Sequence, residues 1–313
     1  MKNVTKILTV VVLCGAMFAS TQRTDALGGS QFWPGDESNI ASFPAQVNSH
    51  AYVQLSGVGA GSTDGVSDDD GGASILFQKD GTTWGFNYGS KDWVNMHWGD
   101  GSQGVTFGLQ NQETNAMAGD PEANVATSLM NYSVGYGNTF GFGELGVHYT
   151  GGDSYDDAMM NVHLKSDFSF WLFDNTYVGL SDLTGDMVLD ADFFSHMDAG
   201  GADVVYGWGV EYDTGDAGGM TQTATLGVEA NMTDWATLRA GYNWSHALTN
   251  DVDNGDTGVS SGTFAWGLGF NWGGLTADLT VSSTLLQDPI GTVTGQRAEG
   301  FLTDTGLTLT YSF

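Results

Sequence analysis

The chain has 313 residues, 8 basic and 37 acidic side chains, and a formal net charge of −29. Such an acidic molecule repels phosphate backbones, so the composition excludes a nucleic-acid partner. The single cysteine, Cys14, excludes a disulfide framework and a site built from several thiolates.

The N-terminus has the order of charges, apolar run and small residues that defines a secretory signal peptide. Lys2 and Lys6 precede an apolar run over 7–19, which is too short to cross a membrane. Thr24 and Ala26 then place small side chains at the −3 and −1 positions of a cleavage site. We therefore expect residues 1–26 to be a signal peptide that is removed, and Arg23 to be removed with it.

Residues 27–49 show no alternation of apolar and polar side chains, although they contain Trp33, Phe43 and Pro44. We expect them to form an N-terminal segment that is not part of a sheet. The sequence leaves open whether this segment enters the rest of the fold or runs along its edge.

From His50 to Phe313 the chain alternates with a period of two, in segments of about ten residues bounded by Gly, Asp and Asn. The clearest segments are 144–149, 158–172, 203–213, 224–231, 237–244, 264–272, 275–282 and 307–313. Shorter, noisier segments lie at 50–58, 73–79, 82–89, 92–98 and 103–111, with hairpin signals at Asp80-Gly81 and Asp100-Gly101.

This alternation predicts an all-β protein, a closed antiparallel transmembrane β-barrel over 50–313. We count sixteen strands, or fourteen if the ambiguous 73–98 region forms fewer. A secreted β-sandwich or β-helix also alternates, but its outer face would carry charges, whereas the polar face here is rich in glycine and nearly free of charge. The side chains that we expect to face lipid include Trp208, Tyr242, Trp266, Leu279, Leu309 and Tyr311.

The chain's last strand ends in Phe313, with Tyr311 and Leu309 at every second position before it. This ending resembles the C-terminal assembly signal of bacterial outer-membrane β-barrels, and 231–242 resembles a turn-and-strand common in that superfamily. The resemblance covers the chain from about His50 in pattern only. It implies a porin-like barrel in the lipid of a Gram-negative outer membrane. It also implies recognition of Phe313 by barrel-assembly machinery, and a homo-oligomer such as a trimer.

Alternation also assigns ionisable side chains to the lumen. They are Glu144, Lys165, Asp167, Asp190, Asp192, Glu211, Glu229, Arg239 and Asp278. Folding the 231–234 turn puts Arg239 opposite Gly227 and diagonal to Glu229, within reach of an ion pair. The general-diffusion porins that this chain resembles set several arginines against an acidic inward-folded loop. This chain has too few cations for that arrangement, which favours a cation-preferring lumen; the alternative is that these carboxylates are merely solvated.

We expect no resident cofactor, and two acidic stretches are candidates for weak binding of divalent cations such as Ca²⁺. They comprise Asp68, Asp69, Asp70, Asp251, Asp253 and Asp256. The second stretch departs from a calcium-binding EF-hand loop, which needs a glutamate where Gly262 stands. The plain alternative is that both stretches only keep the surface soluble.

Catalytic motifs are weak in this sequence. The six histidines show no His-x-x-x-His spacing, so a metal site has no local support. His148 and His163 fall on neighbouring strands with the same face, which we interpret as a lumenal pair and not as catalytic residues. We therefore expect no enzyme activity and assign no catalytic residue.

A sixteen-stranded barrel is wide enough to hold a water-filled channel. The function that we expect is passive, mildly cation-selective diffusion of small hydrophilic solutes. One alternative is a structural barrel with a plugged lumen and acidic loops that bind divalent ions. A membrane-embedded hydrolase is a further alternative.

Overall fold

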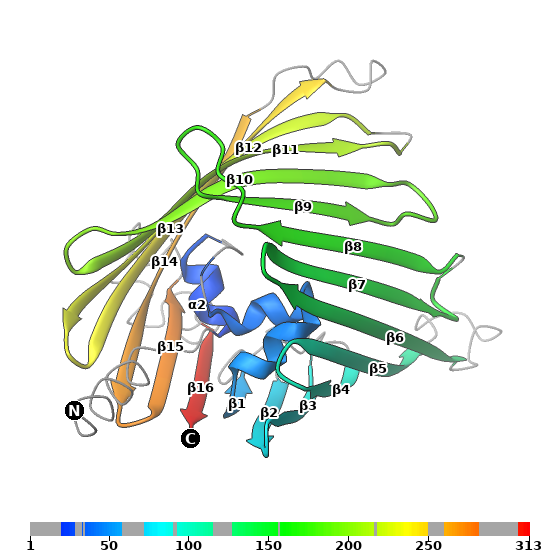
Figure 1. Cartoon of the computed structure of the whole chain (residues 1–313), viewed down its shortest axis with the longest axis horizontal. Coiled ribbons are helices and arrows are strands. Elements are labelled where there is room, and N and C mark those ends of the chain that lie inside the picture. The colour runs from blue at the N-terminus through cyan, green and yellow to red at the C-terminus, as the bar shows by residue number, and fades with distance from the viewer. Residues whose placement is uncertain are drawn as a thin grey trace, which may run out of the picture.

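The computed structural model describes residues 20–28, 33, 35–57, 72–89, 93–155, 157–215, 218–249, 260–281 and 306–313, apart from 115–126. Its sheet is one closed antiparallel barrel of sixteen strands (Figure 1). Each strand pairs with its neighbours in the sequence, and β1 pairs with β16 to close the barrel. The predicted fold class and strand number are therefore confirmed.

The strands are β1 (Tyr52–Ser56), β2 (Gly72–Lys79), β3 (Thr82–Tyr88), β4 (Trp93–Gly99), β5 (Gln103–Thr114), β6 (Thr127–Phe140), β7 (Gly143–Gly152), β8 (Met159–Ser166), β9 (Asn175–Ser181), β10 (Val188–Asp198), β11 (Ala202–Asp213), β12 (Met220–Thr233), β13 (Ala236–Thr249), β14 (Ser260–Trp272), β15 (Leu275–Val281) and β16 (Leu307–Ser312). In the described part of the chain before them lie three short helices: α2 (Thr21–Ala26), η1 (Glu37–Ala41) and η2 (Pro44–Ser49).

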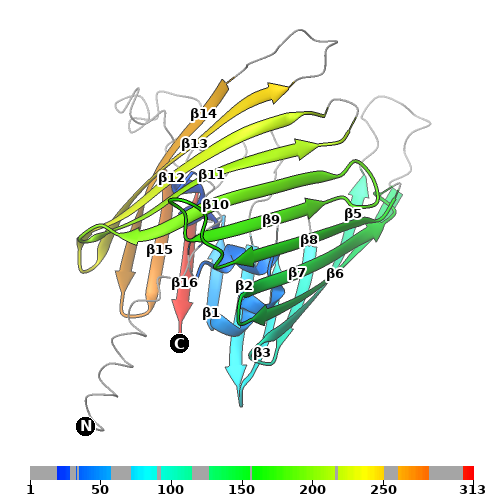
Figure 2. The same ribbon diagram turned by 45° about the horizontal axis from the view of Figure 1, so that its top comes forward.

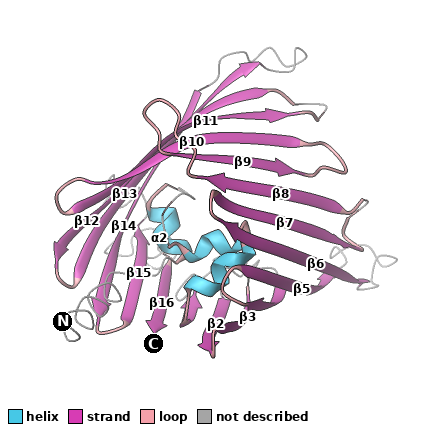
Figure 3. Ribbon diagram, viewed as in Figure 1, coloured by secondary structure: helices cyan, strands magenta, loops and turns pink. Residues whose placement is uncertain are grey.

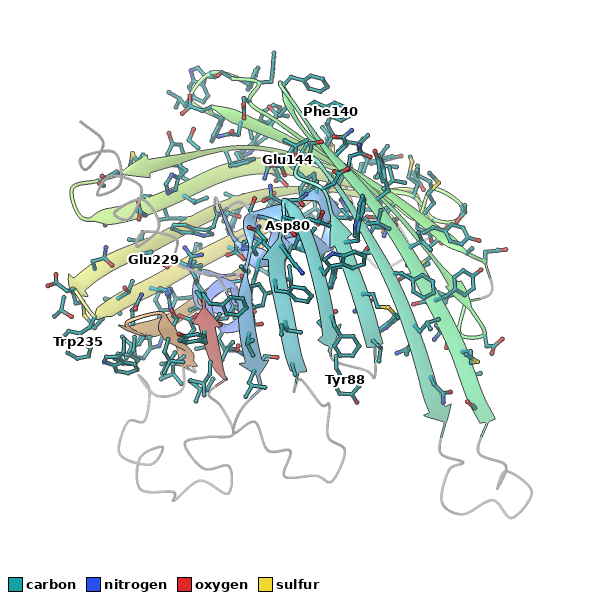
Figure 4. All side chains as sticks on the ribbon, turned by 60° about the horizontal axis from the view of Figure 1, so that its bottom comes forward. Asp80, Tyr88, Phe140, Glu144, Glu229 and Trp235 are labelled. Atoms are coloured by element: carbon teal, nitrogen blue, oxygen red, sulfur yellow. The ribbon has the colours of Figure 1, made fainter. Side chains whose placement is uncertain are left out.

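The two ends of the barrel differ in their connections. Most of the turns that lead from an even-numbered strand to the next odd-numbered strand are tight. At Asp80-Gly81, for example, φ is +53° and +80°. Glycine and aspartate suit this left-handed backbone, which explains the hairpin signal in the sequence. β1 begins and β16 ends at this same end, which we call the turn end. Figure 4 shows Asp80 and Tyr88 at the two ends of the β3 hairpin arm.

The outward face of the barrel is apolar. Tyr242 and Tyr311 are 43 % and 51 % exposed, and Trp208 stacks on the neighbouring Phe193 of this face. Thr308, on the opposite face of the same strand as Tyr311, is fully buried on the inside. The structure thus places large apolar side chains where the alternation predicts lipid contact. No helix of the described chain is both long and apolar enough to cross a membrane.

The N-terminal segment lies inside the barrel. Figures 1 and 3 show α2, η1 and η2 in the lumen, and Figure 2 confirms this placement from a second direction. We call the described residues within 20–50 the luminal segment. Its apolar side chains pack on the wall in three buried clusters, whose members are Ile40, Val47, Tyr52 and Leu76, then Leu27, Trp33 and Val205, then Phe43, Tyr177 and Phe194. The location that the sequence left open is therefore the barrel interior for the described residues of 27–49.

Glycines of the wall make room for this segment. Gly104, Gly137 and Gly146 stand side by side on β5, β6 and β7. A Cβ atom on Gly104 would lie 2.0 Å from the carbonyl oxygen of Pro44, and one on Gly146 would lie 1.9 Å from that of Ser42. The opposite wall does the same at α2, since a Cβ on Gly241 would lie 1.9 Å from the carbonyl carbon of Leu27. The glycine-rich inner face is thus a docking surface.

The predicted strand over 158–172 is too long. β8 ends at Ser166, and the turn that follows closes through a bridge between Phe170 and Phe173. This turn lies against outward side chains of β10, with the rings of Phe170 and Phe193 4.8 Å apart. Its aromatic residues continue the alternation of β8 and pack on the outside of the barrel, although they do not form a strand. Asp167 is consequently exposed beyond the end of β8 and does not belong to a lumen-facing strand.

Candidate functional site in the barrel lumen

Five charged side chains form a buried network between α2 and the wall of β12, β13 and β15. Glu229 accepts hydrogen bonds from Nε of Arg23 (2.8 Å) and Nε of Arg239 (2.6 Å). Asp278 accepts from Nη1 of Arg239 at 2.6 Å, and Asp36 accepts from Nη1 of Arg23 at 3.3 Å. Every charge in this network has a partner, which is the condition for burying charges without a large penalty. Figure 4 shows Glu229 on the inside of the barrel.

The sequence predicted this pair with the wrong register. Arg239 stands directly opposite Glu229, whereas Gly227 stands opposite Gly241. The strands extend further into the turn than expected, and a bulge between Asn231 and Thr233 shifts the pairing. The lumenal ion pair itself is confirmed.

A second charged pair holds η2. Glu144 and Lys165 are opposite each other on β7 and β8, with Nζ and Oε2 3.3 Å apart. Gln46 of η2 donates to Oε1 of Glu144 at 2.5 Å, and Nζ of Lys165 lies 5.1 Å from the ring centre of Phe43. These two lumen charges are therefore committed to binding the luminal segment.

Asp190, Asp192 and Glu211 form an acidic group on β10 and β11. Asp190 faces Glu211 in the register, and Asp192 faces Gly209. The Asp192 carboxylate extends over that glycine, because a Cβ on Gly209 would lie 1.8 Å from Oδ1. The ion pairs of the described residues include none of the three. Three neighbouring carboxylates thus face the lumen without a basic partner, and we call them the acidic group.

A cavity of about 940 Å³ lies between the luminal segment and the β1–β8 side of the wall. Its wall carries hydroxyl, amide, aromatic and imidazole side chains, including Asn95, Thr106 and Asn161. Among the described residues, the carboxyl groups that line it are those of Asp25 and Glu37, both from the luminal segment. None of the nine ionisable residues predicted for the lumen lines this cavity. Uncharged polar residues at the inward-facing positions were the available signal for this lining.

Histidines contribute to the cavity as a neighbouring pair. The rings of His148 and His163 are 5.7 Å apart, as their predicted positions on adjacent strands require. Nε2 of His148 lies 3.2 Å from the carbonyl oxygen of Ser42, and Nδ1 of His163 lies 2.8 Å from the hydroxyl of Tyr177. The pair thus joins the luminal segment to the wall.

Burial changes two titratable groups of the luminal segment. It raises the pKa of the Glu37 carboxyl well above its usual range, against the opposing hydrogen bond from Gln54. It also lowers the pKa of His50 to about 4. Both groups therefore favour the neutral form inside the barrel.

The predicted divalent-cation stretches, 68–70 and 251–256, lie outside the described residues. In the part of the chain that the structure describes, no group of three or more His, Cys, Asp or Glu side chains is arranged to hold a metal ion.

A closed sheet satisfies every backbone hydrogen bond between its strands, and this one turns large apolar side chains outward. That combination belongs to proteins that span a membrane with strands, as bacterial outer-membrane proteins do. The chain folds as a β-barrel of the transmembrane type. No protein-family model matches this barrel, and no curated protein matches it either.

Several solved structures resemble the barrel. CdiB from Acinetobacter baumannii is 10 % identical with a TM-score of 0.39, over 84 % of this chain and 59 % of that one. OmpT of Vibrio cholerae, in a trimer form, is 13 % identical with a TM-score of 0.27, over 79 % and 67 %. An anion-selective porin from Comamonas acidovorans is 14 % identical with a TM-score of 0.26, over 78 % and 59 %. At these identities the likeness concerns the fold alone, and this barrel spans less than two thirds of CdiB.

Proposed function

We propose that this outer-membrane barrel is a passive, mildly cation-selective channel for small hydrophilic solutes. The observation that carries the proposal is the acidic group of Asp190, Asp192 and Glu211, which faces the lumen without a basic partner. Fixed carboxylates attract cations and repel anions over roughly 8 Å at physiological ionic strength.

The remaining lumen charges contribute little to selectivity in this proposal. Glu144 and Lys165 neutralise each other, and Glu229 and Asp278 are paired with arginines. The cation preference is therefore assigned to three side chains on one wall, and not to the net charge of the whole lumen.

The cavity supports the hydrophilic part of the proposal. Its lining offers hydrogen-bond donors and acceptors without strong charge on the barrel wall, through side chains such as Asn95, Thr106 and Asn161. Such a surface accommodates water and small polar molecules without selecting one charge. The luminal segment forms one side of this cavity and so narrows the route that a solute takes.

Planar-bilayer recording tests the proposal directly. The purified full barrel is expected to conduct, with a reversal potential in a salt gradient that indicates cation preference, and the preference should grow as salt is diluted. The triple variant Asp190→Asn, Asp192→Asn, Glu211→Gln should lose most of that preference. The matched control is Asp167→Asn, an exposed carboxylate outside the strands, which should leave selectivity unchanged. A wild-type preference for anions, or a triple variant as selective as the wild type, contradicts the assignment.

A structural barrel with a plugged lumen is the second candidate, and the luminal segment favours it. The wall residues Glu229, Glu144 and Asp278 hold that segment through polar contacts with its side chains. If the full barrel inserts into bilayers and carries no current at any voltage, this second function replaces the first.

The proposed function as a membrane barrel also implies partner molecules. We propose that assembly machinery recognises the C-terminal strand, where the Phe313 side chain is 64 % exposed. Deleting Phe313 should lower the yield of folded barrel in the outer membrane, and chemical cross-linking of intact membranes would show whether the barrel forms a trimer.

A further inference from the structure

Residues 20–27 are held against the inside of the barrel wall by hydrogen bonds and ion pairs. Ser20 is fully buried, and its hydroxyl donates to Oδ2 of Asp278 at 2.9 Å while capping α2 through the backbone N–H of Arg23. The carbonyl oxygen of Gln22 accepts from the Thr280 hydroxyl at 2.8 Å, and the Gln22 side chain also bonds Thr308. This stretch contacts β13, β14, β15 and β16, so it is an integral part of the interior.

Arg23 is the residue on which this arrangement depends. It binds both Glu229 and Asp36, and its guanidinium lies 5.3 Å from the ring centre of Trp33. Cleavage after Ala26 would remove it, leaving the buried carboxylates Asp36, Glu229 and Asp278 with Arg239 as their sole remaining cation among these contacts. A buried carboxylate without a partner is strongly unfavourable.

Even with Arg23 present, the network is one positive charge short. Three carboxylates, Asp36, Glu229 and Asp278, meet two guanidiniums. The missing charge would sit best beside Asp278, whose second oxygen is bound by the Ser20 hydroxyl. A free α-amino group on Ser20 would be a cation at that place.

We propose that the precursor is cleaved between Ala19 and Ser20, so that the mature barrel begins at Ser20 and keeps Arg23. A signal peptidase adds water across this peptide bond, leaving a carboxylate on Ala19 and a protonated α-amino group on Ser20. The new ammonium brings the buried network to zero net charge. Ala19 supplies the small side chain required at the −1 position, and Met17 stands at −3 in place of a small residue, so it is the buried network that supports this site.

The mature mass of the full chain, expressed with its N-terminus and extracted from outer membranes, decides the matter. The expected N-terminal residue is Ser20; a mature chain that starts at Leu27, or anywhere else, overturns the proposal. Two variants of similar bulk test the site itself. Ala19→Tyr should make precursor accumulate, whereas Thr24→Tyr, at the −3 position of the rival site, should not. The reverse pattern also overturns the proposal.

The role of the new ammonium has its own measurement. At neutral pH an amine-reactive reagent should label the Ser20 α-amine at least tenfold more slowly than the exposed Lys79 in the folded barrel. After unfolding it should label the α-amine faster than Lys79, because the ordinary pKa of an α-amine lies well below that of lysine. Asp278→Asn should reduce this protection. An α-amine that reacts as fast as Lys79 in the folded barrel shows that the group is not part of the network and overturns that part of the proposal.

Discussion

The docking of the luminal segment on wall glycines yields a quantitative prediction. We consider the double variant Gly104→Ala, Gly146→Ala. Each new Cβ would lie far inside the normal contact distance from a carbonyl oxygen of the segment, 2.0 Å from that of Pro44 and 1.9 Å from that of Ser42. Neither backbone can yield locally, because each carbonyl belongs to the junction of η1 and η2 and each glycine to a paired strand.

Overpacking of this kind costs roughly 1–3 kcal/mol per site. Because both sites contact the same short stretch, their effects are coupled, and the sum of about 2–6 kcal/mol is an upper range. Since every 1.4 kcal/mol changes an equilibrium tenfold, even about 2 kcal/mol raises the population of undocked segment roughly 30-fold. Strand glycine replaced by alanine is otherwise favourable by about 0.5–1 kcal/mol, so the penalty is specific to the contact.

Two assays measure the outcome. Amide hydrogen exchange of residues 37–49 should accelerate in the double variant, and single-channel conductance should rise if the segment narrows the pore. The control is Gly207→Ala, an inner-face glycine whose added Cβ would meet nothing closer than 3.3 Å. It should leave both quantities unchanged. A double variant that folds and shows wild-type exchange and conductance would refute the role of these glycines in docking.

Three further outcomes follow from the buried charges. Arg239→Met should destabilise the barrel by about 3–5 kcal/mol in denaturant unfolding, because Glu229 and Asp278 lose their shared partner; adding Glu229→Gln should recover part of this. Glu37→Gln should raise the melting temperature at neutral pH and have little effect near pH 4. The buried carboxyl prefers its proton, so stability falls as pH rises above the carboxyl's unfolded pKa. Protonation of His50, whose pKa is about 4, should lower the free energy of unfolding by up to about 3 kcal/mol as the pH falls from 6.5 through 4. A His50→Gln variant should therefore lose less stability over the same pH range.

Much of the fold could be read from side-chain parity. Leu309 and Tyr311 point outward and Thr308 points inward because a strand alternates its faces, and no tertiary information is needed to see it. The same rule failed at Phe170, where a turn kept the parity of a strand by coincidence. Parity cannot detect where a strand stops, since that depends on hydrogen-bond partners from elsewhere in the chain.

The interior was harder to predict. The Arg239–Glu229 pair was foreseen in kind but not in register, because a bulge adds a residue that no local pattern announces. The role of Arg23 was missed entirely, since its partners Glu229 and Asp36 are distant in sequence or separated by an unpatterned segment. Glycines such as Gly146 indicated a small-residue face, but only the structure shows that a backbone occupies the space.

The seam between β1 and β16 bears on how the barrel is assembled. Among the described residues, β1 and β16 share four paired positions, from Tyr52–Ser312 to Leu55–Leu309, while β12 and β13 share a far longer register. Gln54 spans this seam with hydrogen bonds to Thr310 and to Glu37 of the luminal segment. η2 leads directly into β1. If β1 and β16 are the last strands to pair, their pairing also fixes the luminal segment inside the barrel. Closure and internal packing should then appear as one kinetic step, and a barrel with a weakened segment should close slowly even though its strands are unaltered.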